Sequence, residues 1–318
     1  MMDISVVIPV YNEEGSLKEL VAWIRKVMVD NHYSWEIVLI DDGSRDNSWQ
    51  IIELLQKDNP EIKGIKFRRN YGKSAALHCG FDIVKGEVVI TMDSDLQDSP
   101  DEIPELYNMI TKDGFDLVSG WKKKRHDPLF RKNLPSKLYN WTVRRITGIK
   151  LHDMNCGLKA YRYEVVKSIE LYGEMHRYIP VLAKWAGYNK IGEKVVKHYE
   201  RKYGTSKFGI ERFIRGPLDL MSVMFMSRFV KRPMHFFGVL GVIMVILGIA
   251  ATIWIAIQKI IDLKHGITGN LITQSPYFYV ALTSMIIGAQ FFLAGFLGEL
   301  ISRSSSDRNN YQIDKTTF

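Results

Sequence analysis

Cysteine is scarce in this sequence of 318 residues, which contains only Cys79 and Cys156. Two cysteines cannot build the disulfide framework of a small secreted domain. The first residues also lack the basic-then-apolar pattern of a secretory signal peptide. We therefore expect most of the chain to lie in a reducing cytoplasm.

Two glycine-rich phosphate-binding motifs are missing as well. No G-x-G-x-x-G follows the first apolar run, and G-x-x-x-x-G-K-[ST] occurs nowhere. These absences argue against dinucleotide-dependent oxidoreductases and P-loop triphosphatases. Charged residues make up 25% of the chain and apolar residues 46%. This composition excludes a disordered chain, a collagen-like chain and a transporter made only of membrane helices.

Charge is missing from two long runs near the C-terminal end, at residues 236–257 and 277–297. Helices of this length reach about 30 Å, the hydrocarbon thickness of a bilayer. Two buried core helices are the alternative, but soluble helices of this length carry a charged face. The runs therefore predict a transmembrane hairpin within residues 233–300.

Lysine and arginine are unevenly distributed around this hairpin. Residues 201–232 carry eight of them and the tail after residue 298 carries three, whereas the linker at 258–276 has two. By the positive-inside rule, we expect a multi-pass protein of the inner (plasma) membrane with both ends cytoplasmic. The expected parts are a catalytic domain at 1–207, an amphipathic juxtamembrane helix at 208–232, the hairpin, and a cytoplasmic tail at 301–318. A helix that caps the domain is the alternative for 208–232.

Apolar runs of strand length alternate with helical patterns in the first 120 residues. This alternation predicts an α/β fold, with a mostly parallel sheet covered on both faces. Ligands of such sheets bind beyond the carboxyl ends of the strands. The expected strands are at 4–10, 35–40, 64–67, 87–92 and 115–119, and the expected helices at 17–27, 49–55, 74–84 and 103–110.

Acidic groups follow three of the expected strands. They are Glu13 with Glu14, Asp41 with Asp42, and the D-S-D-L-Q-D segment at 93–98. Oxygen ligands that converge at one sheet edge suit Mg²⁺ or Mn²⁺, with substrate phosphates completing the coordination. A single D-x-D is weak evidence, because solvated turns contain it often. Three acidic groups at one edge are stronger evidence.

The net charge of +8 is concentrated in one stretch. Residues 119–162 contain 12 Lys or Arg and only 2 Asp or Glu. Within it, a basic amphipathic helix is expected between Pro135 and Gly148, which suits an anionic leaflet or a lipid phosphate. A solvated basic face without a ligand is the alternative interpretation.

Four motifs resemble those of family 2 glycosyltransferases with the GT-A fold: I-S-V-V-I-P-V-Y-N-E-E at 4–14, L-I-D-D-G-S at 39–44, R-N-Y-G-K at 69–73, and D-S-D-L-Q-D at 93–98. The segment R-K-Y-G-T-S-K-F-G at 201–209, followed by two spans, is similar to polyprenyl-phosphate glycosyltransferases of the GtrB type and, more distantly, to dolichol-phosphate mannose synthases. The resemblance implies inverting transfer of one sugar from a nucleotide diphosphate to undecaprenyl phosphate at the cytoplasmic face. It also implies a role in envelope glycan or lipopolysaccharide modification, and a homo-oligomer, a tetramer by resemblance.

The resemblance also assigns roles to individual residues. The residues implied to bind the nucleotide sugar are Pro9, Tyr11, Glu13, Asp41, Asp42, Asp93 and Lys207. The metal ligands would be Asp93, Asp95 and Gln97, and the residues at the reacting centre Asp95, Asp153 and Arg201. The acceptor phosphate would be held by Arg125, Arg131, Ser136 and Ser206.

The acceptor needs little activation, because a phosphate monoester with a second pKa near ~6 is largely dianionic at pH 7. Asp153 is therefore expected to position the metal or acceptor at least as readily as to act as a base.

Several alternatives stay open at this point. The favoured donor is UDP-glucose or a related UDP-hexose. UDP-formyl-aminoarabinose, UDP-GlcNAc and GDP-mannose are the alternatives, the first because residues 127–148 resemble the branch that uses it. A non-catalytic protein that binds membrane or nucleic acid is the rival class, although no nucleic acid partner is expected. A processive polysaccharide synthase is disfavoured because Q-x-x-R-W is absent.

Overall fold

The computed structural model describes residues 2–123, 144–145, 147–203, 233–266, 271–304 and 313–317. The chain divides into two compact units. The first contains Met1–Leu220 and Arg308–Phe318, and the second contains Met221–Asp307. The C-terminal residues therefore belong to the same unit as the N-terminal ones.

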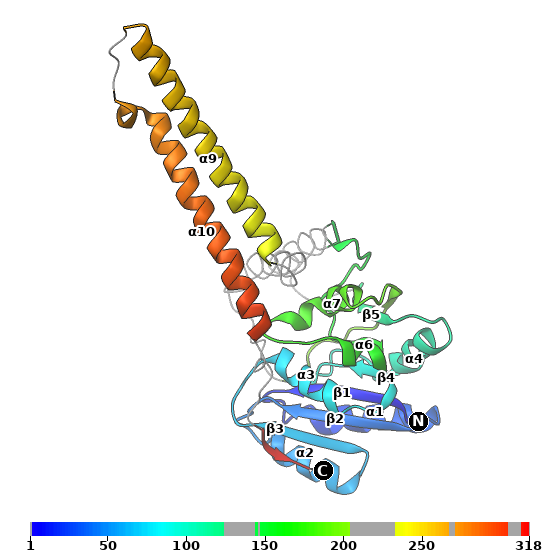
Figure 1. Cartoon of the computed structure of the whole chain (residues 1–318). Coiled ribbons are helices and arrows are strands. Elements are labelled where there is room, and N and C mark those ends of the chain that lie inside the picture. The colour runs from blue at the N-terminus through cyan, green and yellow to red at the C-terminus, as the bar shows by residue number, and fades with distance from the viewer. Residues whose placement is uncertain are drawn as a thin grey trace. The chain divides into compact units, whose positions relative to one another are not determined.

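The first unit is built on a sheet whose described strands have the order β7-β5-β6-β4-β1-β2-β3-β8 (Figure 1). The four central strands β4, β1, β2 and β3 are parallel, as are β5 and β7, whereas β6 and β8 run antiparallel to their neighbours. The predicted α/β fold with a mostly parallel sheet is confirmed. The strands are β1 (Met2–Val10), β2 (Trp35–Asp41), β3 (Ile62–Phe67), β4 (Gly86–Thr91), β5 (Leu117–Trp121), β6 (Lys159–Arg162), β7 (Ile191–Val195) and β8 (Ile313–Thr316).

Helices cover both faces of this sheet. Ile8 and Leu39 belong to the core that also contains residues of α1, α2 and α4. On the other face α3 packs so closely that a Cβ added at Gly80 would lie 2.4 Å from Val7 Cγ1 and 2.9 Å from Ile40 Cδ1. Burying each such aliphatic side chain stabilises the fold by roughly 1.5–3 kcal/mol.

The helices of this unit follow the apolar periodicity of the sequence. In α1 the buried positions are spaced three or four residues apart, which places them on one face. The α-helices are α1 (Leu17–Asp30), α2 (Ser48–Asp58), α3 (Lys73–Ile83), α4 (Ile103–Thr111), α6 (Tyr163–Ser168) and α7 (Ile179–Trp185). Short 3₁₀ turns are η1 (Pro100–Glu102) and η3 (Met175–Tyr178).

The second unit is a pair of long helices, α9 (Pro233–Lys264) and α10 (Pro276–Ser304), with the short η4 (Ile272–Gln274) between them. Both contain a segment long and apolar enough to cross a membrane, Phe236–Lys264 and Pro276–Gly298. Large apolar side chains point outward, with Trp254 66% exposed. A surface of this kind is costly in water and suits a lipid environment.

The two helices approach each other at small residues. A Cβ added at Gly241 would lie 2.4 Å from the carbonyl oxygen of Gly288. In the same interface, Ser284 Oγ donates a hydrogen bond of 3.0 Å to the carbonyl of Met244. The predicted helix at 208–232 and most of the predicted helix at 135–148 lie outside the described residues.

Candidate active site

The polar groups picked out in the sequence gather at the carboxyl edge of the parallel strands β1 to β4. Two residues of the loops at this edge, Asn12 and Leu96, have φ angles of 54° and 58°. A positive φ is uncommon for residues other than glycine, and strain of this kind concentrates at functional sites. This edge is therefore the candidate site.

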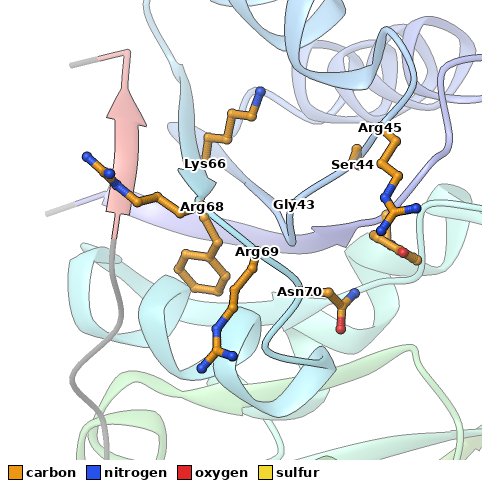
Figure 2. A pocket seen from close by; sticks show the side chains of 9 residues that line it. Gly43, Ser44, Arg45, Lys66, Arg68, Arg69 and Asn70 are labelled. Atoms are coloured by element: carbon orange, nitrogen blue, oxygen red, sulfur yellow. The ribbon is translucent and has the colours of Figure 1, made fainter.

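A cavity of about 530 Å³ opens at one part of the edge (Figure 2). A volume of this size is typical of small-molecule sites. The residues that line it come from the loops after β1 and β2 and from the end of β3, and four of them are cationic. They are Tyr11, Gly43, Ser44, Arg45, Lys66, Phe67, Arg68, Arg69 and Asn70.

The walls of this cavity are tied together by main-chain contacts. Gly43 has φ 72°, and a Cβ there would lie 2.6 Å from the carbonyl carbon of Arg69. Asn12 donates its N–H to Ser44 Oγ at 2.9 Å, and its Oδ1 accepts the N–H of Arg45 at 2.8 Å. The cavity is therefore preformed, and only glycine fits at position 43.

The aspartate pair at the end of β2 is buried beside the cavity. Both oxygens of Asp42 accept backbone N–H groups, from Tyr71 at 2.7 Å and Gly72 at 3.0 Å. Burial nevertheless raises the pKa of Asp42 to about 6. Burial also raises the pKa of Asp41, whose Oδ1 accepts the N–H of Ser44 at 2.8 Å. Asp41 Oδ2 is buried without a hydrogen-bond partner among the described residues.

A second group of carboxylates follows β4. Asp95 Oδ1 accepts the N–H of Gln97 at 3.2 Å, and Asp95 Oδ2 lies 2.5 Å from Arg201 Nη2. Arg201 Nη1 also lies 3.8 Å from Glu13 Oε1, so this arginine joins the loop after β1 to the D-x-D segment. The side chain of Gln97 points to the carbonyl of Tyr199, at 3.4 Å.

Three lysines surround Asp93, and sequence reasoning missed their role. Lys73 Nζ forms an ion pair with Asp93. Burial raises the pKa of Asp93, but the charges of Lys73 and Lys122 outweigh it and hold that pKa below its usual range. Lys122 Nζ lies 2.7 Å from Asp98 Oδ1, and Asp98 is fully buried. Burial lowers the pKa of Lys159, whose Nζ donates to the carbonyl of Cys156.

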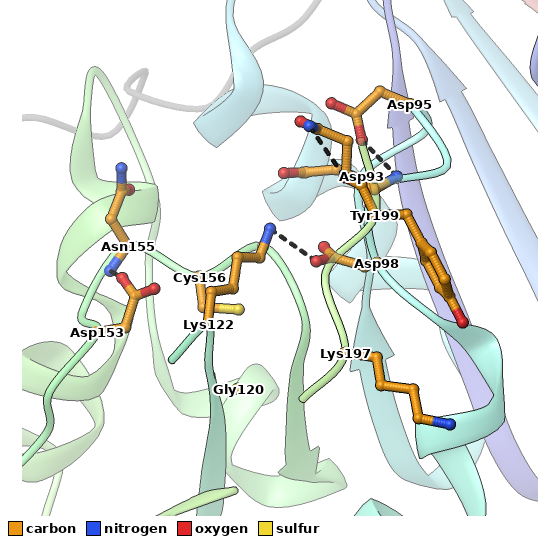
Figure 3. Close-up of polar contacts among 12 residues, drawn as sticks. Asp93, Asp95, Asp98, Gly120, Lys122, Asp153, Asn155, Cys156, Lys197 and Tyr199 are labelled. Atoms are coloured by element: carbon orange, nitrogen blue, oxygen red, sulfur yellow. Dashed lines mark hydrogen bonds and ion pairs between the residues drawn. The ribbon is translucent and has the colours of Figure 1, made fainter. Parts of the chain in front are cut away.

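The structure places Asp153 on the other side of Lys122 from Asp98 (Figure 3). Asp153 is buried, and its Oδ1 accepts the N–H of Asn155 at 3.3 Å. Burial raises the pKa of the nearby Cys156 to about 12, so this thiol is unreactive at neutral pH. Asp153 thus lies close to the carboxylates that follow β4.

Other residues singled out in the sequence fall into two sets. Pro9 lies within β1, at the level of Ile40 of β2, and Tyr11 lines the cavity. The other set lies outside the described residues and consists of Arg125, Arg131, Ser136, Ser206 and Lys207. The structure thus brings the described nucleotide and metal residues to one edge, and leaves Lys207 and the four acceptor residues undescribed.

Protein side chains alone do not form a complete metal site here. Among the described residues, no group of three or more His, Cys, Asp or Glu side chains converges to hold an ion. Asp93 and Asp95 nevertheless offer carboxylate oxygens at the sheet edge. Mg²⁺ is usually bound by one or two carboxylates together with substrate phosphates, and this donor set fits that pattern.

Comparison with known proteins gives consistent results. The model of glycosyl transferase family 2 matches residues 5–170. The chain is 37% identical to dodecaprenyl-phosphate galacturonate synthase of Rhizobium johnstonii, over 95% of this chain and 88% of the relative. It is also 37% identical to undecaprenyl-phosphate 4-deoxy-4-formamido-L-arabinose transferase of Shewanella sediminis, over 96% and 88%.

Solved structures with a similar fold include glucosyl-3-phosphoglycerate synthase from Mycobacterium tuberculosis in complex with Mn²⁺, UDP-glucose and phosphoglyceric acid. The TM-score is 0.52 at 18% identity, and the match covers 71% of this chain and 79% of the other. At this identity the likeness concerns the fold alone.

Proposed function

This chain belongs to glycosyl transferase family 2, and we propose that it transfers one sugar from a nucleotide diphosphate to a polyprenyl phosphate at a membrane. One observation carries the proposal: the cation-lined cavity and the carboxylates of Asp93 and Asp95 lie at the same edge of the sheet. The chain is therefore an enzyme of the glycosyltransferase class, as the resemblance implied. The names of the two relatives supply the acceptor, a long-chain prenyl phosphate.

The donor sugar proposed here differs from the glucose favoured by the sequence. Neither relative named above transfers glucose: their names specify galacturonate and 4-deoxy-4-formamido-L-arabinose. Of the two sugars, only the uronate has a carboxylate, and a lysine of the site could pair with it. Lys159 is buried next to Asp93 and forms no ion pair with a carboxylate among the described residues. We therefore propose a UDP-linked uronate, with the formamido-pentose as the second candidate.

A divalent cation fits the residues present. Asp93 and Asp95 would hold it with the donor diphosphate, and the likeness to a fold that binds Mn²⁺ with UDP-glucose supports this assignment. The ion would neutralise charge on the leaving diphosphate. Arg201, now paired with Asp95, stands where its guanidinium can meet the same diphosphate. The acceptor phosphate is largely dianionic at pH 7, so Asp153 is proposed to position it rather than to remove a proton.

Membrane attachment follows from α9 and α10, whose composition suits a bilayer. We propose that the sheet unit is cytoplasmic and that the helices cross as a hairpin. The position of β8 supports this topology, because the residues after α10 return to the sheet that precedes α9. The homotetramer also remains a proposal.

The test is transfer by the purified full chain in lipid nanodiscs. Undecaprenyl phosphate is incubated with UDP-galacturonate, UDP-4-deoxy-4-formamido-L-arabinose, UDP-glucose, UDP-GlcNAc or GDP-mannose, and the lipid product is weighed by mass spectrometry. We expect one sugar per lipid, with loss of product in EDTA and recovery with Mg²⁺ or Mn²⁺.

The variant Asp95→Asn should lower kcat by about 10²–10³-fold, because it removes a charge that holds the ion at the reacting phosphate. Asp113→Asn is the matched control, since Asp113 is exposed and remote from the strand edge. A chain that forms no sugar lipid from any donor would be a binding protein, and a product of several sugars would indicate a processive synthase.

A further inference from the structure

The last described residues of the chain form a strand on the open edge of the sheet. β8 pairs antiparallel with β3, with Ile65 opposite Thr316 and Lys66 opposite Lys315 (Figure 1). Without β8, the N–H and C=O groups on that side of β3 would form an exposed edge. The residues that complete the sheet therefore come from beyond the helix pair.

Thr317 extends this pairing through its side chain. The N–H of Gly64 donates to Thr317 Oγ1 at 2.7 Å, and the N–H of Thr317 donates to the carbonyl of Gly64 at 3.1 Å. A Cβ at Gly64 would lie 3.2 Å from Thr317 Cγ2 and 2.5 Å from Ile52 Cγ2. The absence of a side chain at position 64 thus lets the threonine close over β3.

The strand held in this way continues directly into the cavity. Lys66 and Phe67, the last residues of β3, line the cavity, as do the next three residues. The contact between Thr317 and Gly64 lies two residues before Lys66. Any movement of β3 at Gly64 would therefore be transmitted to the cationic wall.

β8 is held weakly enough to respond to what fills the cavity. Ile313 is 45% exposed, so the strand buries little apolar surface. Lys315 lies opposite Lys66, and like charges at opposed positions destabilise a strand pair. Elements with few apolar contacts open at low free-energy cost. An anion near Lys66 would reduce the repulsion and favour docking of the strand.

We propose that β8, with Thr317, is a positioning element for donor binding: it holds the end of β3 in the conformation that receives the nucleotide diphosphate. The inference rests on the proposed function only in taking a nucleotide as the ligand of the cavity. By thermodynamic reciprocity, the nucleotide stabilises the docked strand as much as the strand favours the nucleotide. Thr317 therefore acts through β3 and is not a catalytic residue.

The first experiment measures nucleotide affinity of the full chain in detergent by calorimetry, with UDP, GDP and CDP. Thr317→Val keeps the shape of the side chain and removes the oxygen that accepts the Gly64 N–H. We expect the Kd of the preferred nucleotide to rise about threefold to tenfold, the usual effect of one lost hydrogen bond. The donor KM should rise in parallel, while kcat at saturating donor stays within about twofold. Thr273→Val is the control, since it makes the same chemical change at an exposed threonine of η4, outside β8.

A second experiment begins with the unaltered chain, so that its main result does not depend on whether a variant folds. Hydrogen exchange of the C-terminal peptide that contains β8 is followed with and without nucleotide. Nucleotide should slow exchange at residues 313–317 and at Gly64. In Lys315→Glu, where the repulsion becomes attraction, exchange should already be slow and the further slowing by nucleotide smaller.

The outcomes separate this inference from the proposed function. A chain that binds GDP in place of UDP would contradict the proposed donor, and the tests of β8 would proceed with GDP. The inference is overturned if Thr317→Val leaves the Kd unchanged or if nucleotide does not alter exchange of the tail. It is also overturned if Thr317→Val lowers kcat and raises the acceptor KM as much as it raises the donor KM, because that pattern indicates general loss of structure. A chain that binds none of the three nucleotides would overturn both proposals.

Discussion

The cavity and the carboxylate group lie along the same strand edge but are built in opposite ways. The cavity is an open hollow with cationic side chains around it, and the main chain of Gly43 packs directly against that of Arg69. In the carboxylate group every aspartate after β4 is already matched by a cation of the protein, Asp93 by Lys73, Asp95 by Arg201 and Asp98 by Lys122.

The cavity is therefore open to a ligand, whereas the carboxylates after β4 are already engaged by cations of the protein. The cavity presents its cationic side chains around an open hollow that an anionic ligand can enter. A metal ion that took Asp95 as a ligand would compete with the contact between Arg201 and Asp95. Asp98 is different again, because its pair with Lys122 is buried and has no solvent to replace it. The three predictions below test this difference between the cavity and the carboxylates, from the largest expected effect to the smallest.

Removal of the buried cation should have the largest effect. Lys122→Met leaves the carboxylate of Asp98 buried without its partner, which costs about 3–5 kcal/mol for a buried pair. The thermal midpoint of the full chain in detergent, measured at pH 7, should fall accordingly. The double variant Lys122→Met with Asp98→Asn should recover much of the loss. If Lys122→Met has the same thermal midpoint as the wild type, the ion pair of Lys122 and Asp98 is not buried in solution. The contrast between the cavity and the carboxylates would then be wrong.

The pH dependence of stability should be smaller and tied to Asp42. The pKa of Asp42 is raised by burial to about 6, above its value in the unfolded chain, so the folded state binds the proton more tightly. The free energy of unfolding should therefore decrease as the pH increases from about 4 to 6, by roughly 2 to 3 kcal/mol, and then level off.

The measurement is the thermal midpoint between pH 4 and 7 for the wild type and Asp42→Asn, and the difference between the two isolates this residue. Asp113→Asn serves as control and should keep the wild-type slope. An Asp42→Asn protein with the same pH dependence as the wild type would show that the carboxylate is solvated.

An exposed cation of the cavity should have the smallest effect. Arg45 lines the hollow but is itself exposed, so its attraction for an anionic donor is screened by salt. Arg45→Ala should raise the nucleotide Kd about twofold to threefold at low ionic strength and have less effect at 0.5 M salt. Arg25→Ala, an exposed arginine on α1, should leave the Kd unchanged. If both variants raised the nucleotide Kd equally, the net charge of the protein, and not the position of Arg45, would determine the affinity.

The sequence predicts the central sheet well because β1 to β4 are apolar runs followed by periodic helices. Each predicted strand and helix of this part is present, and the ends differ by only a few residues. The strands β6, β7 and β8 have no such pattern. β8 reads I-D-K-T, which is polar and short, and it pairs only because β3 offers a free edge far away in the sequence.

Part of the candidate site was predictable from the sequence because its residues follow the predicted central strands. Topology alone brings Asp41, Asp42 and Asp93 to one edge, because parallel strands end together. The lysines could not be assigned in this way, since Lys159 and Asp93 are 66 positions apart and meet through the antiparallel β6. The one available signal was Lys159 itself, a charged residue between Leu158 and Ala160 in an apolar stretch.

The location of β8 also bears on how the protein is made. Its partner β3 is synthesised early, whereas β8 leaves the ribosome only after both long helices. If the two helices cross a bilayer, as proposed, the sheet can be completed only after an even number of crossings, because otherwise β8 and β3 would lie on opposite sides. With that topology, closure of the sheet edge would depend on correct insertion of the helices, and a misinserted chain would leave the edge of β3 exposed.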